Sequence, residues 1–123
     1  MRLVFVLDCA DPDSLADFWA EALGYERGPL EAPYVALTDP QGVNPQILLQ
    51  RVPEPKSGKN RMHPDLRVAD MDAELARVTA LGASVVRGPL VDGGWPTTVL
   101  ADPEGNEFCL IVDPRHHEKG SST

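Results

Sequence analysis

The chain is short of cysteine and of basic residues, and each shortage excludes a class of protein. Its 2 cysteines among 123 residues, Cys9 and Cys109, form neither a disulfide framework nor a spaced metal motif. We expect both to be free thiols. Lysine and arginine total 11 against 19 acidic residues, a net charge of −8. That balance excludes the basic face on which a nucleic-acid partner depends, and it is compatible with neutral or cationic ligands or with solubility alone.

Long apolar runs are also missing, since no stretch reaches the length that spans a bilayer. The short apolar run at residues 3–7 lacks a small-residue cleavage site after it, so it indicates a first strand rather than a signal peptide. We therefore expect a cytoplasmic protein with no membrane partner. The length is that of one domain.

What the chain does have is an internal repeat. Three landmarks recur in the same order at offsets of 59, 58 and 63 residues. They are an acidic tag at 11–13 (DPD) and 70–72 (DMD), a Leu-Gly pair at 23–24 and 81–82, and a turn tag at 39–42 (DPQG) and 102–105 (DPEG). Such a pattern indicates two copies of one supersecondary unit that are too small to be stable separately.

Each copy is expected to have the order βαβββ. Asp11 or Asp13 can cap the first helix, which carries an apolar stripe that includes Trp19 and ends at Gly24. The expected strands are residues 3–8, 25–28, 33–38, 46–52, 62–68, 83–87, 95–101 and 106–112, with the second helix at 70–81 and a glycine-rich loop at 88–94. Module one covers about 2–53, a linker 54–61, module two about 62–113, and a polar tail 114–123. The adjacent His116 and His117 of that tail are assigned no site.

These motifs resemble the vicinal oxygen chelate superfamily of glyoxalase I, bleomycin-resistance proteins and extradiol dioxygenases, in its glyoxalase-like domain branch. Residues 11–19 (DPDSLADFW) with 23–25 (LGY) resemble the first helix of that family, 102–106 (DPEGN) its last hairpin turn, and 58–66 (GKNRMHPDL) the restart of its second module. The resemblance implies an α+β fold. Two tandem βαβββ modules would form a cupped, mostly antiparallel sheet with helices outside, as a single domain over residues 1–123. It also implies a homodimer.

In the metal-binding members of the superfamily, four ligands come from the first and last strands of the two modules. Counting from the helix-opening aspartates places His63 and Val4 at the first-strand positions. Counting from the second turn tag places Cys109 at one last-strand position, where the family usually has glutamate, and Gln50 is its expected equivalent in module one. One imidazole, one amide, one thiol and one valine are a poor ligand set. We therefore expect no tightly bound metal and no other cofactor.

The expected pocket lies between the two sheets and is lined by six residues: Val4, Val6, Gln50, His63, Trp95 and Cys109. Trp95 would stack on the ligand, while His63 would be a polar anchor or an acid–base catalytic residue, or else a buried imidazole satisfied by its neighbours. Asp65 would orient that imidazole or pair with Arg67. Cys109 would be a small buried hydrophobic residue or a nucleophile, and Cys9 should face the helix and be inert.

The sequence leaves three functions open. The first is a small-molecule-binding protein with a degenerate metal site, which sequesters a ligand as bleomycin-resistance proteins do. The second is a lyase or isomerase of glyoxalase type that uses His63 as an acid–base group or a partial metal site. The third is an interaction module beside a catalytic partner. Whether the chain is an enzyme at all stays open at this stage, and neither the substrate nor the ligand can be identified from the sequence.

Overall fold

The computed structural model describes residues 1–114, so the tail at 115–123, with His116 and His117, lies outside the described residues. The chain divides into two compact units, Met1–Ser57 and Gly58–Thr123. The boundary falls inside the linker expected at 54–61. Neither helix of the described residues is long and apolar enough to cross a membrane.

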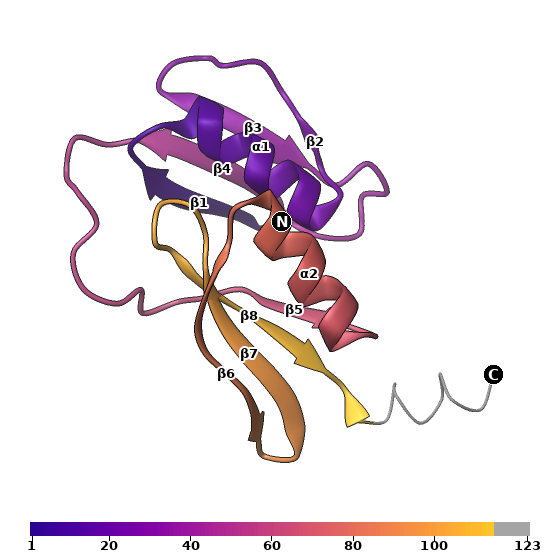
Figure 1. Cartoon of the computed structure of the whole chain (residues 1–123). Helices are drawn as coiled ribbons and strands as arrows, with labels where there is room; N and C mark the ends of the chain where they lie inside the picture. Colours follow the sequence, from indigo (N-terminus) through magenta and orange to yellow (C-terminus); the bar gives the residue numbers. More distant parts are fainter. Residues whose placement is uncertain (115–123) are drawn as a thin grey trace. The chain divides into compact units, whose positions relative to one another are not determined.

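Both units have the order βαβββ, which confirms the predicted α+β fold (Figure 1). The elements of unit 1 are β1 (Val4–Cys9), α1 (Pro12–Leu23), β2 (Glu26–Arg27), β3 (Tyr34–Thr38) and β4 (Gln46–Arg51). Those of unit 2 are β5 (Asp65–Val68), α2 (Met71–Leu81), β6 (Ser84–Asp92), β7 (Trp95–Ala101) and β8 (Glu107–Val112).

Each unit contains one four-stranded sheet, in the order β1-β4-β3-β2 or β5-β8-β7-β6. The first and last strands of a unit pair in parallel, and the other neighbours pair antiparallel. A parallel pair needs a long crossover connection, and the helix supplies its first part. The sheets are therefore mostly antiparallel, as expected.

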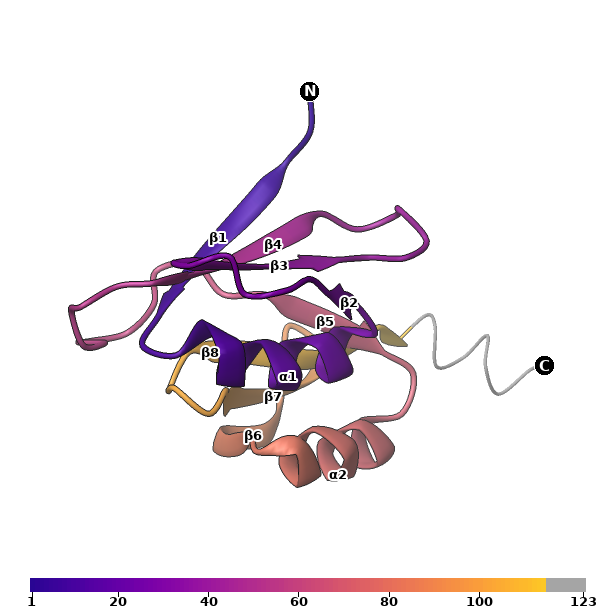
Figure 2. The ribbon, with the colours of Figure 1, turned by 90° about the horizontal axis from the view of Figure 1, so that it is seen from above.

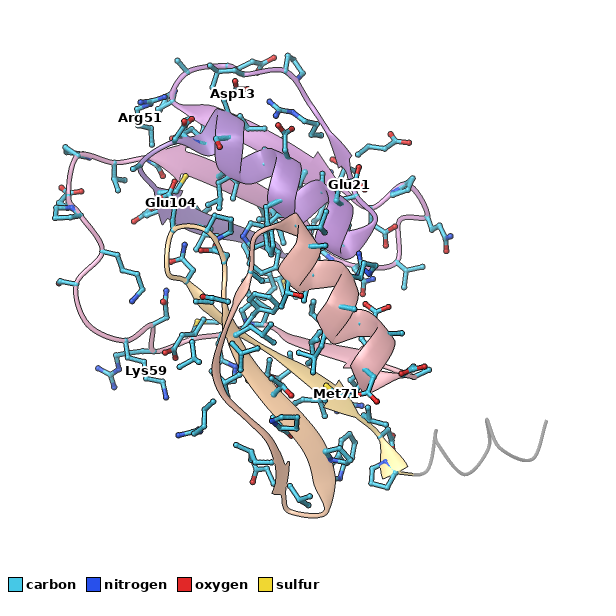
Figure 3. All side chains as sticks on the ribbon, in the orientation of Figure 1. Asp13, Glu21, Arg51, Lys59, Met71 and Glu104 are labelled. Atoms are coloured by element: carbon cyan, nitrogen blue, oxygen red, sulfur yellow. The ribbon has the colours of Figure 1, made fainter. Side chains whose placement is uncertain are left out.

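The repeated aspartate and glycine landmarks are the ends of the helices. The Asp11 carboxylate accepts a hydrogen bond from the Ser14 amide at 3.2 Å, and the Asp70 carboxylate accepts one from the Ala73 amide at 3.1 Å. Of the two caps that the sequence allowed, Asp11 is therefore the one used. Gly24 ends α1 with φ of 70°, a left-handed conformation that favours glycine. Asp13 and Glu21 mark the two ends of α1 in Figure 3.

The core of unit 1 lies between α1 and one face of its sheet (Figure 2). Trp19 is 3% exposed and its ring meets that of Phe18 edge to face at 5.1 Å between centroids. Cys9 is buried as well, which confirms its expected place on the helix side. The buried apolar side chains are Leu15, Ala16, Phe18, Trp19 and Ala22 of the helix and Val35, Leu37 and Leu49 of the strands.

The core of unit 2 depends much less on its helix. Val78 is the one fully buried residue of α2, whereas α1 buries six. The strands compensate with a second set of buried apolar residues, which are Leu100, Ala101, Phe108, Leu110 and Val112. The Thr98 hydroxyl, also on this side of the sheet, donates to the Met71 sulfur at 3.4 Å.

The largest difference from the predicted elements is β6. The sequence pattern placed a strand at 83–87 and a loop at 88–94, but β6 continues through residue 92 and turns only at Gly93 and Gly94. Two register shifts, between Val85 and Arg87 and between Arg87 and Leu90, let the strand absorb the Gly-Pro pair. That interpretation was wrong because a glycine next to a proline marks a bulge as readily as a loop.

The turn tags organise hairpins through their aspartates. The Asp39 carboxylate accepts hydrogen bonds from the amides of Gln41, Val43 and Asn44 at 2.9–3.2 Å. These bonds hold the pKa of the Asp39 carboxyl below its ordinary value, and the bond from the Asn44 amide has the largest effect. Asp102 is 3% exposed and accepts from the amides of Glu104 and Asn106, both at 2.9 Å. The repeated turn tag is therefore structural.

We expect that neither unit folds alone. Each has one helix on one small sheet, too little apolar burial to offset roughly 1–2 kcal/mol of backbone entropy per residue. Fragments 1–58 and 59–123 should show no cooperative unfolding transition by circular dichroism during urea titration, whereas the full chain should show one. A sigmoidal transition in either fragment would contradict this expectation.

Candidate functional site

The residues singled out by the sequence lie on the sheet face opposite the helix in each unit. Side chains alternate along a strand, so Val4 and Val6 of β1 point away from the core side that Leu7 and Cys9 occupy. On β4, Leu48 and Gln50 alternate with the buried Leu49 in the same way. We call these surfaces the helix-free faces.

The helix-free face of unit 1 carries a hollow of about 350 Å³. That volume lies within the range of small-molecule pockets, roughly 300–1,000 Å³. Eight residues line the hollow: Val6 of β1, Gly28, Pro29 and Glu31 of the loop before β3, Tyr34 and Ala36 of β3, and Leu48 and Gln50 of β4.

The lining combines an apolar floor with a few polar groups. Val6, Ala36 and Leu48 come from three adjacent strands and form the floor. The backbone keeps the loop close to it, because the Gly28 amide donates to the Ala36 carbonyl at 2.8 Å. Glu31, Tyr34 and Gln50 bring a carboxylate, a phenol and an amide to the same space. This mixture suits an organic molecule held by shape and by one or two hydrogen bonds.

The helix-free face of unit 2 carries a different group, which we call the triad: His63, Asp65 and Cys109. Their donor atoms all lie within 4.8 Å of one another. The Asp65 carboxylate lies 3.1 Å from His63 Nδ1, and the Cys109 sulfur lies 4.0 Å from the same nitrogen. The side chains of His63 and Asp65 are 41% and 46% exposed, while Cys109 is buried.

The geometry of the triad decides between alternatives that the sequence left open. His63 is not a buried imidazole, and Asp65 takes the imidazole as its partner. Burial first, and then the Asp65 carboxylate, raise the pKa of the Cys109 thiol. A thiol with a raised pKa holds its proton at neutral pH, so Cys109 is not an activated nucleophile.

Arg67 and Trp95 form a separate pair on this face. The Arg67 guanidinium lies 5.1 Å from the centroid of the Trp95 ring, which is cation–π distance. One face of the indole is therefore covered by a side chain of its own unit. A ligand that stacks on Trp95, as the sequence suggested, would have to use the other face or displace Arg67.

The strand registers correct one expected equivalence. Asp65 is paired with Cys109 in unit 2, and the corresponding pair in unit 1 is Val6 with Leu48. Leu48, rather than Gln50, is therefore the counterpart of Cys109. Gln50 was expected because it is the polar residue that closes its strand. The turn after β3 is longer than the turn after β7, so a count from the turn tag could not identify Leu48.

The metal site that the family resemblance implies does not fit these residues. Unit 1 offers Val4 and Leu48 at the two ligand positions, and neither side chain has a donor atom. Unit 2 offers His63 and Cys109, so only two of the four ligand positions carry a side chain with a donor atom. No step of a mechanism is derived from a metal bound in that arrangement.

The structure places the residues of the expected pocket on both units. Val6 and Gln50 meet in the hollow, His63 and Cys109 meet in the triad, and Val4 shares the helix-free face of unit 1 without lining the hollow. The sequence missed Gly28, Pro29, Glu31, Tyr34 and Ala36. Strand alternation gave a signal for Tyr34 and Ala36, since Val35 and Leu37 are the buried positions of β3.

Comparisons with known proteins agree with this architecture. The model of a family described as "Glyoxalase-like domain" matches residues 4–111. A glyoxalase/bleomycin resistance protein/dioxygenase family enzyme from Burkholderia phytofirmans PsJN is 17% identical and superposes with a TM-score of 0.75, over 89% of this chain and 95% of that one. TnmS3, an antibiotic binding protein from Streptomyces sp. CB03234, is 24% identical with a TM-score of 0.68, over 91% and 94%.

A third structure, a glyoxalase-related enzyme from Fulvimarina pelagi, is 17% identical with a TM-score of 0.73, over 93% of this chain and 88% of that one. A search of curated proteins found no match. The paired βαβββ units define the class of glyoxalase and bleomycin-resistance folds. Because the family model covers most of its length, the chain belongs to the glyoxalase-like domain family.

Proposed function

We propose that this chain is a small-molecule-binding protein that holds its ligand in the hollow of unit 1. The observation that carries the proposal is the lining of that hollow, an apolar floor of Val6, Ala36 and Leu48 with the Gln50 amide at its side. Nothing in the lining resembles a phosphate-binding loop or a cluster of catalytic groups. The hollow is thus better suited to retain a molecule than to transform it.

The charges at the hollow and of the whole chain indicate which class of ligand the protein prefers. Glu31 brings a carboxylate to the hollow, and the whole chain has a net charge of −8. Both disfavour an anionic ligand and favour a neutral or cationic one. Tyr34 and Pro29 provide flat surfaces at the wall, so we propose an aromatic or polycyclic ligand. Sequestration of such a compound is the role that TnmS3, named an antibiotic binding protein, illustrates on this fold.

Equilibrium dialysis with three dyes tests the ligand class: neutral Nile red, cationic acridine orange and anionic anilinonaphthalene sulfonate. The neutral and cationic dyes should bind the full chain more tightly than the anionic dye. A preference for the anionic dye, or no binding of any dye at millimolar protein, would contradict the proposal.

The Gln50→Ala variant tests the place of binding. It should weaken the dye that binds best by about tenfold, the value of one hydrogen bond of roughly 1.4 kcal/mol. Gln46→Ala is the matched control, because Gln46 lies on the same face of β4 but outside the hollow. Equal losses in the two variants would show that the dye binds elsewhere.

A second candidate is a lyase or isomerase in which His63 moves a proton. It rests on the 3.1 Å contact between His63 Nδ1 and Asp65, which orients the ring and leaves Nε2 for a substrate. Exchange of the carbon-bound protons of hydroxyacetone in D₂O, followed by NMR, would detect such proton transfer. Catalysed exchange that His63→Ala abolishes, without a change in dye affinity, would favour the enzyme over the binding protein.

We also propose that the chain is a cytoplasmic homodimer. The support is apolar surface that stays exposed on both units, with Leu3 58% exposed in unit 1 and Val91 70% exposed in unit 2. Light scattering after size exclusion should give twice the chain mass of 13.4 kDa. A monomer mass at high protein concentration would refute the dimer.

A further inference from the structure

The floor of the hollow is a row of side chains that runs straight across the sheet of unit 1. The strand registers pair Leu48 of β4 with Val6 on one side and with Ala36 on the other. We call these three residues the apolar row. Neighbouring strands lie about 4.7–4.9 Å apart, so the row is roughly 10 Å wide. That width matches a ligand with one or two fused rings.

A second row, of polar side chains, lies two residues away along each strand. Here Gln50 of β4 is paired with Asp8 of β1 and with Tyr34 of β3. Glu31 extends this row, because it forms a bridge with Tyr34 in which each amide donates to the carbonyl of the other residue, at 2.8 and 2.9 Å. We call these four residues the polar row. A rise of about 3.3–3.4 Å per residue separates the two rows by roughly 7 Å.

The polar row offers hydrogen-bond acceptors and an aromatic ring. The carboxylates of Asp8 and Glu31 stand at its two ends, with the side chains of Gln50 and Tyr34 between them. In the part of the chain that the structure describes, neither carboxylate forms an ion pair. Asp8, Glu31 and Tyr34 are exposed, so each can meet a ligand. Carboxylates beside an aromatic ring are suited to hold an ammonium group.

The arginines of unit 1 do not neutralise the polar row. The Arg2 guanidinium donates to Gln46 Oε1 at 2.9 Å, and Gln46 lies four residues before Gln50 on β4. Four residues of a strand span about 13 Å, more than the Debye length of about 8 Å at physiological salt. Arg27 forms ion pairs with two aspartates of α1. The helix-free face of unit 1 therefore has an anionic end, and this end adjoins the hollow.

We propose that the ligand of the hollow is an aromatic amine in its cationic form, with its ring on the apolar row and its ammonium group at the polar row. This ligand class rests on the proposed function, because it specifies which compound the hollow retains. The separation of roughly 7 Å between the rows fits an amine two or three atoms away from its ring. Tyr34 attracts the ammonium group through its ring, and the two carboxylates attract it through their charge.

Three indole compounds that differ only in the end of the side chain test the ligand class: tryptamine, tryptophol and indole-3-propionate. Their dissociation constants are measured with the full-length protein by equilibrium dialysis at neutral pH and physiological salt. Tryptamine, which is cationic under these conditions, should bind at least about tenfold more tightly than the neutral tryptophol. The anionic indole-3-propionate should bind most weakly.

Variants of the polar row locate the ammonium group. The double variant Asp8→Asn/Glu31→Gln should reduce the ratio of tryptamine affinity to tryptophol affinity to about one, since it removes both charges. Tyr34→Leu should lower this ratio about threefold, because leucine is apolar but has no aromatic ring. Glu26→Gln is the matched control and should keep the ratio, since it removes a charge from an exposed residue of unit 1 that does not line the hollow.

The outcomes separate this ligand class from the proposed function. Equal affinities for tryptamine and tryptophol, no binding of tryptamine, or a ratio that survives the double variant would overturn the ligand class. Nile red binding that Gln50→Ala weakens would still support the hollow as the binding site. A ratio that Glu26→Gln lowers as far as the double variant does would show that net charge alone attracts the amine, and would also overturn the ligand class. Failure of the three indoles and of all three dyes to bind would overturn both proposals.

Discussion

The Ala36→Trp variant is expected to lose ligand binding by at least about a hundredfold. Ala36 lies at the middle of β3 on the helix-free face, and its methyl group forms part of the floor of the hollow. An indole at this position would occupy the space that the ligand needs, so the loss is steric and exceeds that of any single hydrogen bond. The Ala36 side chain points away from α1, so the core of unit 1 should be unaffected.

The measurement is the affinity of the best dye by equilibrium dialysis, beside the free energy of unfolding in urea. Val43→Trp is the control, since it adds the same bulk to an exposed residue of unit 1 that does not line the hollow. Ala36→Trp should keep the stability of the wild type while its binding is lost. Unchanged dye affinity in Ala36→Trp would show that the hollow is not the binding site.

The Asp102→Ala variant is expected to lose about 2–3 kcal/mol of stability, the penalty for leaving buried donors without a charged acceptor. The Asp102 carboxylate accepts from two amides, and the Asn106 side-chain amide also donates to it at 3.0 Å. Asn106 is itself buried, so water cannot readily replace the lost acceptor.

Asp39→Ala is the matched control because it removes the same residue of the repeated turn tag. The Asp39 turn is more exposed, and water can take over the amides that its carboxylate holds. The free energy of unfolding from urea titration should therefore fall clearly less for Asp39→Ala than for Asp102→Ala. Equal losses would mean that burial does not set the strength of these two turns.

The repeat explains why the fold could be predicted from the sequence and the sites only in part. Aspartate caps, Leu-Gly helix ends and turn tags are local signals, and the structure shows a hydrogen bond or a positive φ behind each. The counterpart of Cys109 could not be found by counting, since loop lengths differ between the units. Only the ladder register identifies Leu48.

The hollow also could not be predicted from short sequence motifs. Gly28, Pro29 and Glu31 belong to a loop whose return over β3 depends on the hydrogen bond between the Gly28 amide and the Ala36 carbonyl. Strand alternation places Asp65 and His63 on the same face, and the pairing of their side chains was one of the two roles expected for Asp65. Its distance from the Cys109 sulfur required the pairing of β5 with β8.

The irregular course of β6 bears on how this protein stays dispersed. β6 is the last strand in the sheet order of unit 2, and its exposed Val85, Val86 and Val91 would favour edge-to-edge aggregation if the strand were flat. The register shifts around Arg87 and the missing amide proton of Pro89 interrupt the row of hydrogen-bonding groups that another chain would need. The bulged segment that carries β6 beyond the expected strand thus disfavours amyloid-like assembly at this edge.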